Sequence, residues 1–168
     1  MTPTPKNSKD LELFTIGVYG STEDDFFKKL QASNIDLFCD IRMRRAVRGS
    51  QYAFVNSQRL QKRLEEIRIP YLYLKELAPT KEIRQKQKDA DAAQSVEKRK
   101  REELSPEFVE AYKLDKLSNF DTTAFVDSLG SKVRRIAFFC VEAAPTACHR
   151  SLVANKIAKD LDLNVTNI

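Results

Sequence analysis

The segment at residues 135–142 constrains the fold of this chain more than any other. Its sequence is RIAFFCVE, and its middle is apolar without the alternation of a strand that has one face in water. A strand that is apolar on both sides belongs to a sheet covered on both faces, which is typical of parallel sheets. The sequence therefore predicts an α/β fold in which helices cover both faces of a mostly parallel sheet.

Three earlier segments, residues 13–20, 35–42 and 71–74, have the composition of further strands. Ser21 and Asp24 resemble a capping box and predict a helix start between the first two. Apolar residues then recur at helical spacing, first at Phe26, Phe27 and Leu30 and later at Leu60, Leu64 and Ile67. This alternation of strands and helices predicts parallel strands joined by crossover helices.

The second half of the chain begins with a charged segment at residues 80–104 that contains few large apolar side chains. It is interpreted either as a solvated helix or mobile excursion, or as a lid or basic arm over the site. Further on, residues 121–129 predict a short helix, with Asp121 as N-cap and Gly130 just past its end. A last helix is expected from about Pro145 to Leu161, and a short strand near Val165.

Length and composition fit one globular domain over residues 13–168. Residues 1–12 contain two prolines and few apolar side chains, which predicts a flexible arm. The longest apolar run is far too short to cross a bilayer, and no stretch resembles a signal peptide. Three cysteines without disulfide-like spacing favour a reducing compartment. A cytoplasmic protein with free thiols and no membrane partner is expected.

Candidate functional residues follow from the rule that parallel sheets bind ligands beyond the carboxyl ends of their strands. The polar or reactive residues at or after the four predicted strand ends are Tyr19, Ser21, Asp40, Arg42, Glu76, Cys140 and Glu142. Because side chains alternate along a strand, Asp40 and Arg42 are expected to share one side, as are Cys140 and Glu142. These residues therefore define one candidate cleft.

The start of the last helix adds Cys148, His149 and Arg150 to this cleft. Backbone N–H groups in a first helical turn attract anions and lower the pKa of a nearby thiol. We expect Cys148 to be the reactive thiol, whereas Cys39 and Cys140 on buried strands are interpreted as core residues. The alternative is structural: Arg150 pairs with Glu142 or Asp40, and His149 hydrogen-bonds a neighbouring loop.

A basic run, RMRRAVR, follows the second predicted strand at residues 42–48. Arg42 and Arg45 in this run are candidate phosphate contacts, and nearby aromatic residues are candidates for stacking on a base. The alternative is a surface loop with solvated arginines. No Walker loop, GxGxxG, HExxH or GxSxG motif occurs, so no known cofactor is indicated.

Residues at and beyond the end of the fourth predicted strand include candidates for metal binding and for a disulfide. Cys140, Glu142, Cys148 and His149 are suitable ligand types, but their spacing matches no common zinc pattern, so no bound metal is predicted. A redox pair formed by Cys140 and Cys148 is the other alternative, because spacing along the chain does not give the distance between two thiols.

The chain resembles the DUF488 family, a domain of unknown function. The motifs that carry the resemblance are an opening strand with a glycine-rich end, a D-x-R, a strand near an E-L, and a closing C-x-E…C-H-R. They correspond to Thr15-Ile-Gly17 through Gly20-Ser21 and Phe26, to Asp40-Ile-Arg42, to Ile69-Pro-Tyr71 with Glu76-Leu77, and to Cys140-Val-Glu142 with Cys148-His-Arg150. The chain departs from the family at Met43-Arg44 and Ala78-Pro79, where a proline and a glycine pair are common. The resemblance implies an α/β fold with a shared site and names no reaction.

The leading hypothesis is an enzyme or ligand-binding domain for a phosphate-bearing or other anionic molecule. Arg42 and Arg150 would contact the anion, Asp40, Glu142 and His149 would transfer protons, and Cys148 would be the nucleophile. The alternatives are a nucleic-acid-binding module without catalysis, which would use residues 42–48 and the charged segment, and a purely structural partner protein. Arginines in the same cleft as Cys148 would favour the small molecule, and a flat basic face would favour nucleic acid. The sequence does not predict an oligomeric state.

Overall fold

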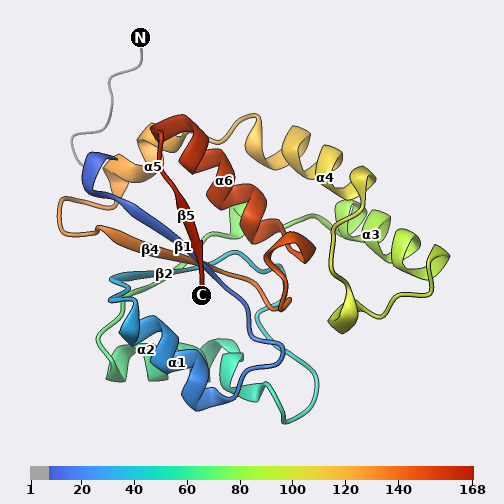
Figure 1. Ribbon diagram of the computed structural model, residues 1–168, viewed down its shortest axis with the longest axis horizontal. Helices are drawn as coiled ribbons and strands as arrows, with labels where there is room; N and C mark the ends of the chain where they lie inside the picture. Colours follow the sequence, from blue (N-terminus) through green and yellow to red (C-terminus); the bar gives the residue numbers. More distant parts are fainter. Residues whose placement is uncertain (1–7) are drawn as a thin grey trace.

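Five parallel strands form the central sheet of the computed structural model, which describes residues 8–168 (Figure 1). The strands are β1 (Glu12–Ile16), β2 (Leu37–Asp40), β3 (Tyr71–Tyr73), β4 (Arg135–Phe139) and β5 (Val165–Asn167). Their order is β3-β2-β4-β1-β5, and every pairing is parallel. The predicted α/β class is therefore confirmed, with a sheet that is entirely parallel.

Helices cover both faces of the sheet in a single domain. They are α1 (Glu23–Ala32), α2 (Ser57–Glu66), α3 (Lys81–Ala93), α4 (Pro106–Tyr112), α5 (Thr122–Ser128) and α6 (His149–Leu161). Figure 1 shows α1 and α2 below the sheet and α5 and α6 above it. The chain crosses the sheet in one direction from β1 to β3 and returns from β3 to β5, so the two groups of helices lie on opposite faces.

The core consists of two apolar layers, because neighbouring residues of a buried strand face opposite sides. Phe138 packs in the layer under α5 and α6, and Phe139 packs in the layer over α1 and α2. Cys39 and Phe38 divide between the same two layers on β2. None of the four is measurably exposed, which is the two-sided burial that the apolar run predicted.

Several predicted boundaries differ from the structure. Residues 1–7 of the predicted arm lie outside the described residues, whereas Ser8–Asp10 form a 3₁₀ helix and Leu11 is buried. The N-cap of α1 is Thr22, whose hydroxyl accepts from Asp25 N–H at 3.2 Å, and not Ser21. Strands β1, β2 and β4 end earlier than predicted, because the chain leaves the sheet to build loops at the carboxyl edge.

The predicted last helix also begins later than expected. Pro145–Ala147 form a separate 3₁₀ turn, and Cys148 is the extended N-cap that precedes α6. The prediction for residues 121–129 is confirmed, since Asp121 caps α5 and Gly130 has a φ of 78° just past its end. None of the helices in residues 8–168 has both the length and the apolar character needed to span a membrane.

Candidate functional site

A pocket of about 450 Å³ lies at the carboxyl edge of the sheet. Its walls come from the loops after β1, β2 and β4, from the start of α6, and from α3 and the chain that follows α3. The loop after β4 leads to one face of the sheet, and the loops after β1 and β2 lead to the other. Ligands of α/β proteins bind at such a reversal of strand connections.

Four of the almost completely buried polar or reactive side chains that line this pocket come from the chain between the end of β4 and the start of α6. We call them the buried cluster: Cys140, Glu142, Cys148 and His149. The sulfur of Cys140 lies 3.2 Å from Glu142 Oε2, and the sulfur of Cys148 lies 3.7 Å from His149 Nδ1. His149 Nε2 lies 2.8 Å from the carbonyl oxygen of Ile41 and must be the donor there, because a carbonyl only accepts. The fold thus unites four residues that the sequence placed at one edge.

The electrostatics of the buried cluster differ from the prediction for Cys148. Burial opposes the ionisation of Cys140, but a hydrogen bond from Cys148 and the charge of His149 hold the pKa of Cys140 well below its ordinary value. Burial and the hydrogen bond with Cys140 raise the pKa of Cys148 well above the usual range. Of these two thiols, Cys140 is therefore the one with the lowered pKa, although the sequence favoured a core role for it.

The other two members of the buried cluster also have shifted pKa values. Burial lowers the pKa of His149, but the negative charge of Cys140 and hydrogen bonding raise it overall. Burial and the negative charge of Cys140 both raise the pKa of Glu142. The cations Lys98 and Arg101 lower it, but the pKa stays above its ordinary value. Proton positions within the buried cluster are thus mutually dependent.

Asp40 and Arg42 form a buried ion pair at the end of β2. Arg42 donates from Nε to Asp40 Oδ1 at 2.9 Å and from Nη2 to Oδ2 at 2.8 Å, while the Tyr71 hydroxyl donates to Oδ2 at 2.7 Å. Asp40 does not line the pocket, whereas Arg42 does. Arg42 Nη2 also donates to Val55, and its Nη1 is buried without a hydrogen-bond partner in the described part of the chain. Asp40 is therefore placed to hold Arg42 and not to meet a ligand.

Arg150 has a different position from the one expected of an anion contact. It is 1% exposed and does not line the pocket. Its Nη1 and Nη2 donate to the carbonyl oxygens of Glu142 and Ala143, and not to the carboxylate of Glu142 or Asp40. Gly17 makes room for it, because a Cβ there would lie 3.0 Å from Arg150 Nη1. Arg150 thus supports the loop after β4.

The charged segment at residues 80–104 reaches the pocket and forms one of its walls. It contains α3 and a 3₁₀ turn at Lys98–Lys100. Arg101 ties it to the rest of the site, since Arg101 donates to Asp91 at 2.8 Å, to Glu142 at 3.0 Å and to the carbonyl of Ala147 at 3.1 Å. Of the two interpretations, the arm over the site agrees with this placement.

Five further cationic side chains line the pocket, and four of them are exposed. We call them the cationic rim: Arg44, Arg48, Arg84, Lys88 and Arg99. Within residues 8–168 none of them has a carboxylate partner at salt-bridge distance. Arg99 instead lies over the rings of Tyr19 and Tyr52, at 5.1 and 5.5 Å from their centroids. The predicted residue Tyr19 therefore belongs to the pocket wall.

Besides Asp40 and Arg150, three other predicted site residues lie outside this pocket. Ser21 lines a separate shallow depression beside α1. Arg45 stacks over Tyr73, with its guanidinium carbon 4.1 Å from the ring centroid. Glu76 is exposed in the 3₁₀ turn Lys75–Leu77. They neighbour the strand ends along the chain, but their loops carry them away from the pocket.

Sequence reasoning did not single out the residues that α3 contributes. Arg84 and Lys88 are four residues apart on this helix, so the like charges lie on the same side and repel each other. That spacing was the available signal, because repelling cations on one helix face suggest a negatively charged partner. Arg101 carried no comparable signal within a run of lysines and arginines.

Comparison with known proteins gives one match. The family described as "Domain of unknown function DUF488" matches residues 22–157, a range that includes every member of the buried cluster and of the cationic rim. No curated protein and no solved structure matches the chain.

Proposed function

The chain belongs to the DUF488 family of unknown function, and we propose that it binds a small phosphate-bearing or otherwise anionic molecule in the pocket beside the buried cluster. The observation that carries this proposal is the imbalance of charge in the pocket wall. Eight lysines and arginines line it against two carboxylates, Asp91 and Glu142. Since both carboxylates already pair with Arg101, they do not neutralise the cationic rim.

Arg42 provides a second line of support. Although it is 3% exposed and bonded to Asp40, its Nη1 has no hydrogen-bond partner within the described residues. A buried donor without a partner costs about 1–3 kcal/mol, and more when it is charged. An anionic ligand that reached Nη1 would recover this energy.

The shape of the site favours a small molecule over nucleic acid. Arg42, Arg44 and Arg48 line the same pocket as Cys148, which favours a small molecule, whereas a flat basic face away from Cys148 would favour nucleic acid. The volume of about 450 Å³ is within the range of ligand pockets, about 300–1,000 Å³. The half-buried ring of Tyr19, paired with Arg99, offers a surface for an aromatic or sugar portion of the ligand.

Catalysis is an extension of this proposal and not a requirement for it. Glu142 and His149 are the proton-transfer candidates that line the pocket, and both sit beside Cys140. Asp40 is removed from this role by its burial behind Arg42, and Arg150 by its bonds to backbone carbonyls.

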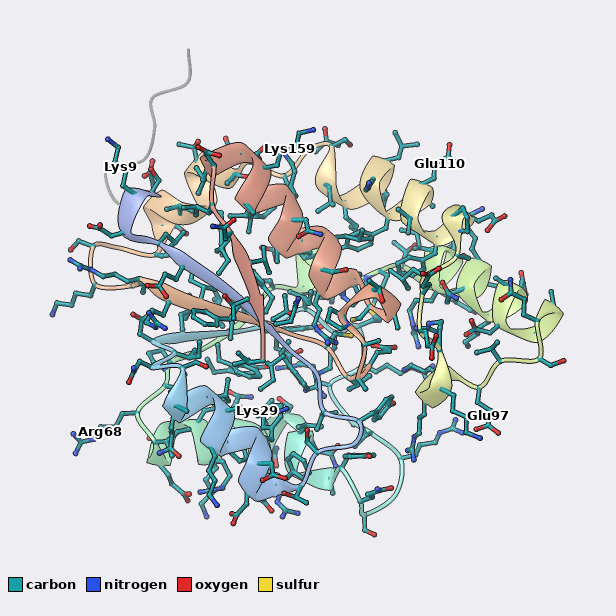
Figure 2. All side chains as sticks on the ribbon, viewed as in Figure 1. Lys9, Lys29, Arg68, Glu97, Glu110 and Lys159 are labelled. Atoms are coloured by element: carbon teal, nitrogen blue, oxygen red, sulfur yellow. The ribbon has the colours of Figure 1, made fainter. Side chains whose placement is uncertain are left out.

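Calorimetric titration with pyrophosphate tests the proposal on protein freed of metal with a chelating resin. We expect binding, and we expect the double variant Arg84→Gln with Lys88→Gln to weaken it at least about tenfold, since a charge-assisted hydrogen bond contributes about 1.5–3 kcal/mol. Lys159→Gln is the matched control, because Lys159 is exposed on α6 and well separated from the segment around Glu97 (Figure 2).

Two results would overturn the proposal. The first is that neither pyrophosphate nor any member of a panel of nucleotides and sugar phosphates binds. The second is that a single-stranded oligonucleotide binds instead, with an affinity that falls steeply with salt and is not displaced by pyrophosphate. Salt dependence that flattens in Arg44→Gln with Arg48→Gln would then assign the basic loop to nucleic acid.

A further inference from the structure

Two sulfur atoms and one imidazole nitrogen of the buried cluster converge. The ligand atoms of Cys140, Cys148 and His149 all lie within 4.8 Å of one another, and all three residues are buried. The spacing of these residues along the chain argued against a metal centre. The fold changes that conclusion, because the loop after β4 returns Cys148 and His149 to the place where Cys140 leaves the sheet.

We propose that Cys140, Cys148 and His149 bind one zinc ion at the inner end of the pocket. Thiolate and imidazole are the ligands that zinc prefers, and two thiolates balance its double positive charge. A tetrahedral zinc with bonds of about 2.3 Å to sulfur and about 2.0–2.1 Å to nitrogen holds its ligand atoms about 3.5–3.8 Å apart. The distance of 3.7 Å between Cys148 Sγ and His149 Nδ1 already agrees with such an edge.

The orientation of His149 supports the proposal independently. Histidine ligands in zinc sites usually donate their second ring N–H to a carbonyl or carboxylate, which fixes the nitrogen that faces the metal. His149 donates from Nε2 to the carbonyl of Ile41 at 2.8 Å, so its Nδ1 is left for the ion. The Asp40–Arg42 ion pair flanks Ile41 on both sides and holds this carbonyl in place.

The backbone explains how neighbouring residues can serve as ligands. Cys148 is extended, with φ of −141° and ψ of 147°, and His149 is the first helical residue of α6. This change from extended to helical backbone brings both side chains to the same side. Successive residues of a continuous strand would instead point to opposite sides.

Three protein ligands leave a fourth position of the tetrahedron for water or for a ligand. Zinc sites that perform chemistry have this arrangement, whereas structural sites use four protein ligands. Cys140, Cys148 and His149 all line the pocket, and so does Glu142, whose Oε2 is 3.2 Å from the sulfur of Cys140. The fourth position would therefore open towards the pocket, with the Glu142 carboxylate beside it.

Metal titration of the full chain tests this inference without any anionic ligand. Protein treated with a chelating resin and kept reduced is titrated with Co²⁺ as a spectroscopic substitute and then with Zn²⁺. We expect one ion per chain, sulfur-to-cobalt charge-transfer bands, the strong visible absorption of tetrahedral cobalt, and displacement of Co²⁺ by Zn²⁺. Cys140→Ser, Cys148→Ser and His149→Gln should each weaken binding by at least about tenfold, because changes that only reorient a ligand already cost about 10–100-fold.

Cys39→Ala is the matched control, since Cys39 is a buried thiol in the other core layer and no ligand. X-ray absorption of the zinc-loaded wild-type protein is a second measurement that does not depend on any variant. It should show two sulfur neighbours at about 2.3 Å and nitrogen or oxygen neighbours at about 2.0–2.1 Å.

Three results would overturn the inference: no stoichiometric binding of either metal, equal loss of binding in Cys39→Ala, or a first shell without two sulfurs. Failure here would leave the proposed anion binding untouched, because pyrophosphate is titrated into metal-free protein.

Discussion

The buried cluster and the cationic rim belong to one pocket, but they differ in how many partners within the fold fix their side chains. Each member of the buried cluster has a near neighbour that fixes it, as the carbonyl of Ile41 fixes His149 and Arg101 fixes Glu142. The side chains of the cationic rim have no carboxylate partners among residues 8–168, and four of the five are exposed, Arg84 being half-buried.

This contrast separates stability from binding. A buried polar group must be paired or it destabilises the fold, so the partners of the buried cluster contribute to the free energy of unfolding. Apart from the contact of Arg99 with the rings of Tyr19 and Tyr52, exposed cations near one another contribute mainly mutual repulsion to the folded state, but they raise the local concentration of an anion. Changes near the buried cluster should therefore cost stability, and changes to the cationic rim should cost affinity alone.

The largest effect is expected where the support of the buried cluster is removed. Asp40→Asn leaves the buried guanidinium of Arg42 without its counter-charge, and the loss of one partner of a buried pair costs about 3–5 kcal/mol. Urea denaturation measures this loss. Asp24→Asn is the control, because Asp24 pairs with Lys28 at 3.8 Å on the surface and its removal should change stability by no more than about 0.5 kcal/mol. Similar values for the two variants would contradict the contrast.

A smaller loss is expected from closing the space beside Arg150. In Gly17→Ala the new Cβ would lie 2.1 Å from the carbonyl oxygen of Glu142, so the backbone must shift. Overpacking of this kind costs about 1–3 kcal/mol. Hydrogen exchange should accelerate at the amides of Val18 and Tyr19, which donate to Val141 at 3.1 and 3.0 Å. Unchanged protection of these two amides would show that the loop absorbs the methyl group elsewhere.

Sequence reasoning succeeded where burial and strand periodicity decide the structure. The apolar run at residues 135–142 indicated two-sided burial. The rule of strand ends located Arg42, Cys140 and Glu142, and the predicted start of the last helix added His149; all four line the pocket. It also proposed roles that depend on proton positions, such as the low pKa of Cys148. Those depend on three-dimensional contacts, and here the contact with Cys140 reverses the order of the two thiols.

The roles of the buried arginines around the site could not be predicted, because they depend on contacts between polar groups that are far apart in the sequence. Nothing in a run of lysines and arginines marks Arg101 as the one that returns to Glu142, 41 residues away. Arg150 was expected to meet carboxylates, whereas it satisfies backbone carbonyls that the turn after β4 leaves without strand partners. Carbonyls carry no sequence signal, so a buried arginine of this kind resembles a functional one until the fold is known.

Arg101 connects the buried cluster to the charged segment, which carries Arg99 of the cationic rim. Its substitution is therefore a further test of the contrast between the two. The side chain is 9% exposed and donates to Asp91, Glu142 and the carbonyl of Ala147, so it links the charged segment to the loop before α6. In Arg101→Gln these bonds are lost, but Lys98 remains 3.8 Å from Glu142 and keeps part of its compensation. We therefore expect the free energy of unfolding to fall by about 1–2 kcal/mol, less than when a buried charge loses all of its partners.

Locally, hydrogen exchange should become faster across residues 94–104, because the contacts of Arg101 that hold this segment are lost. Lys100→Gln is the control, since the Lys100 side chain is 77% exposed and forms its ion pair with Glu97. If Arg101→Gln leaves exchange in residues 94–104 unchanged, the wall of the pocket is held by its remaining contacts to Thr146 and Gln87, and the cationic rim keeps its place without support from the buried cluster.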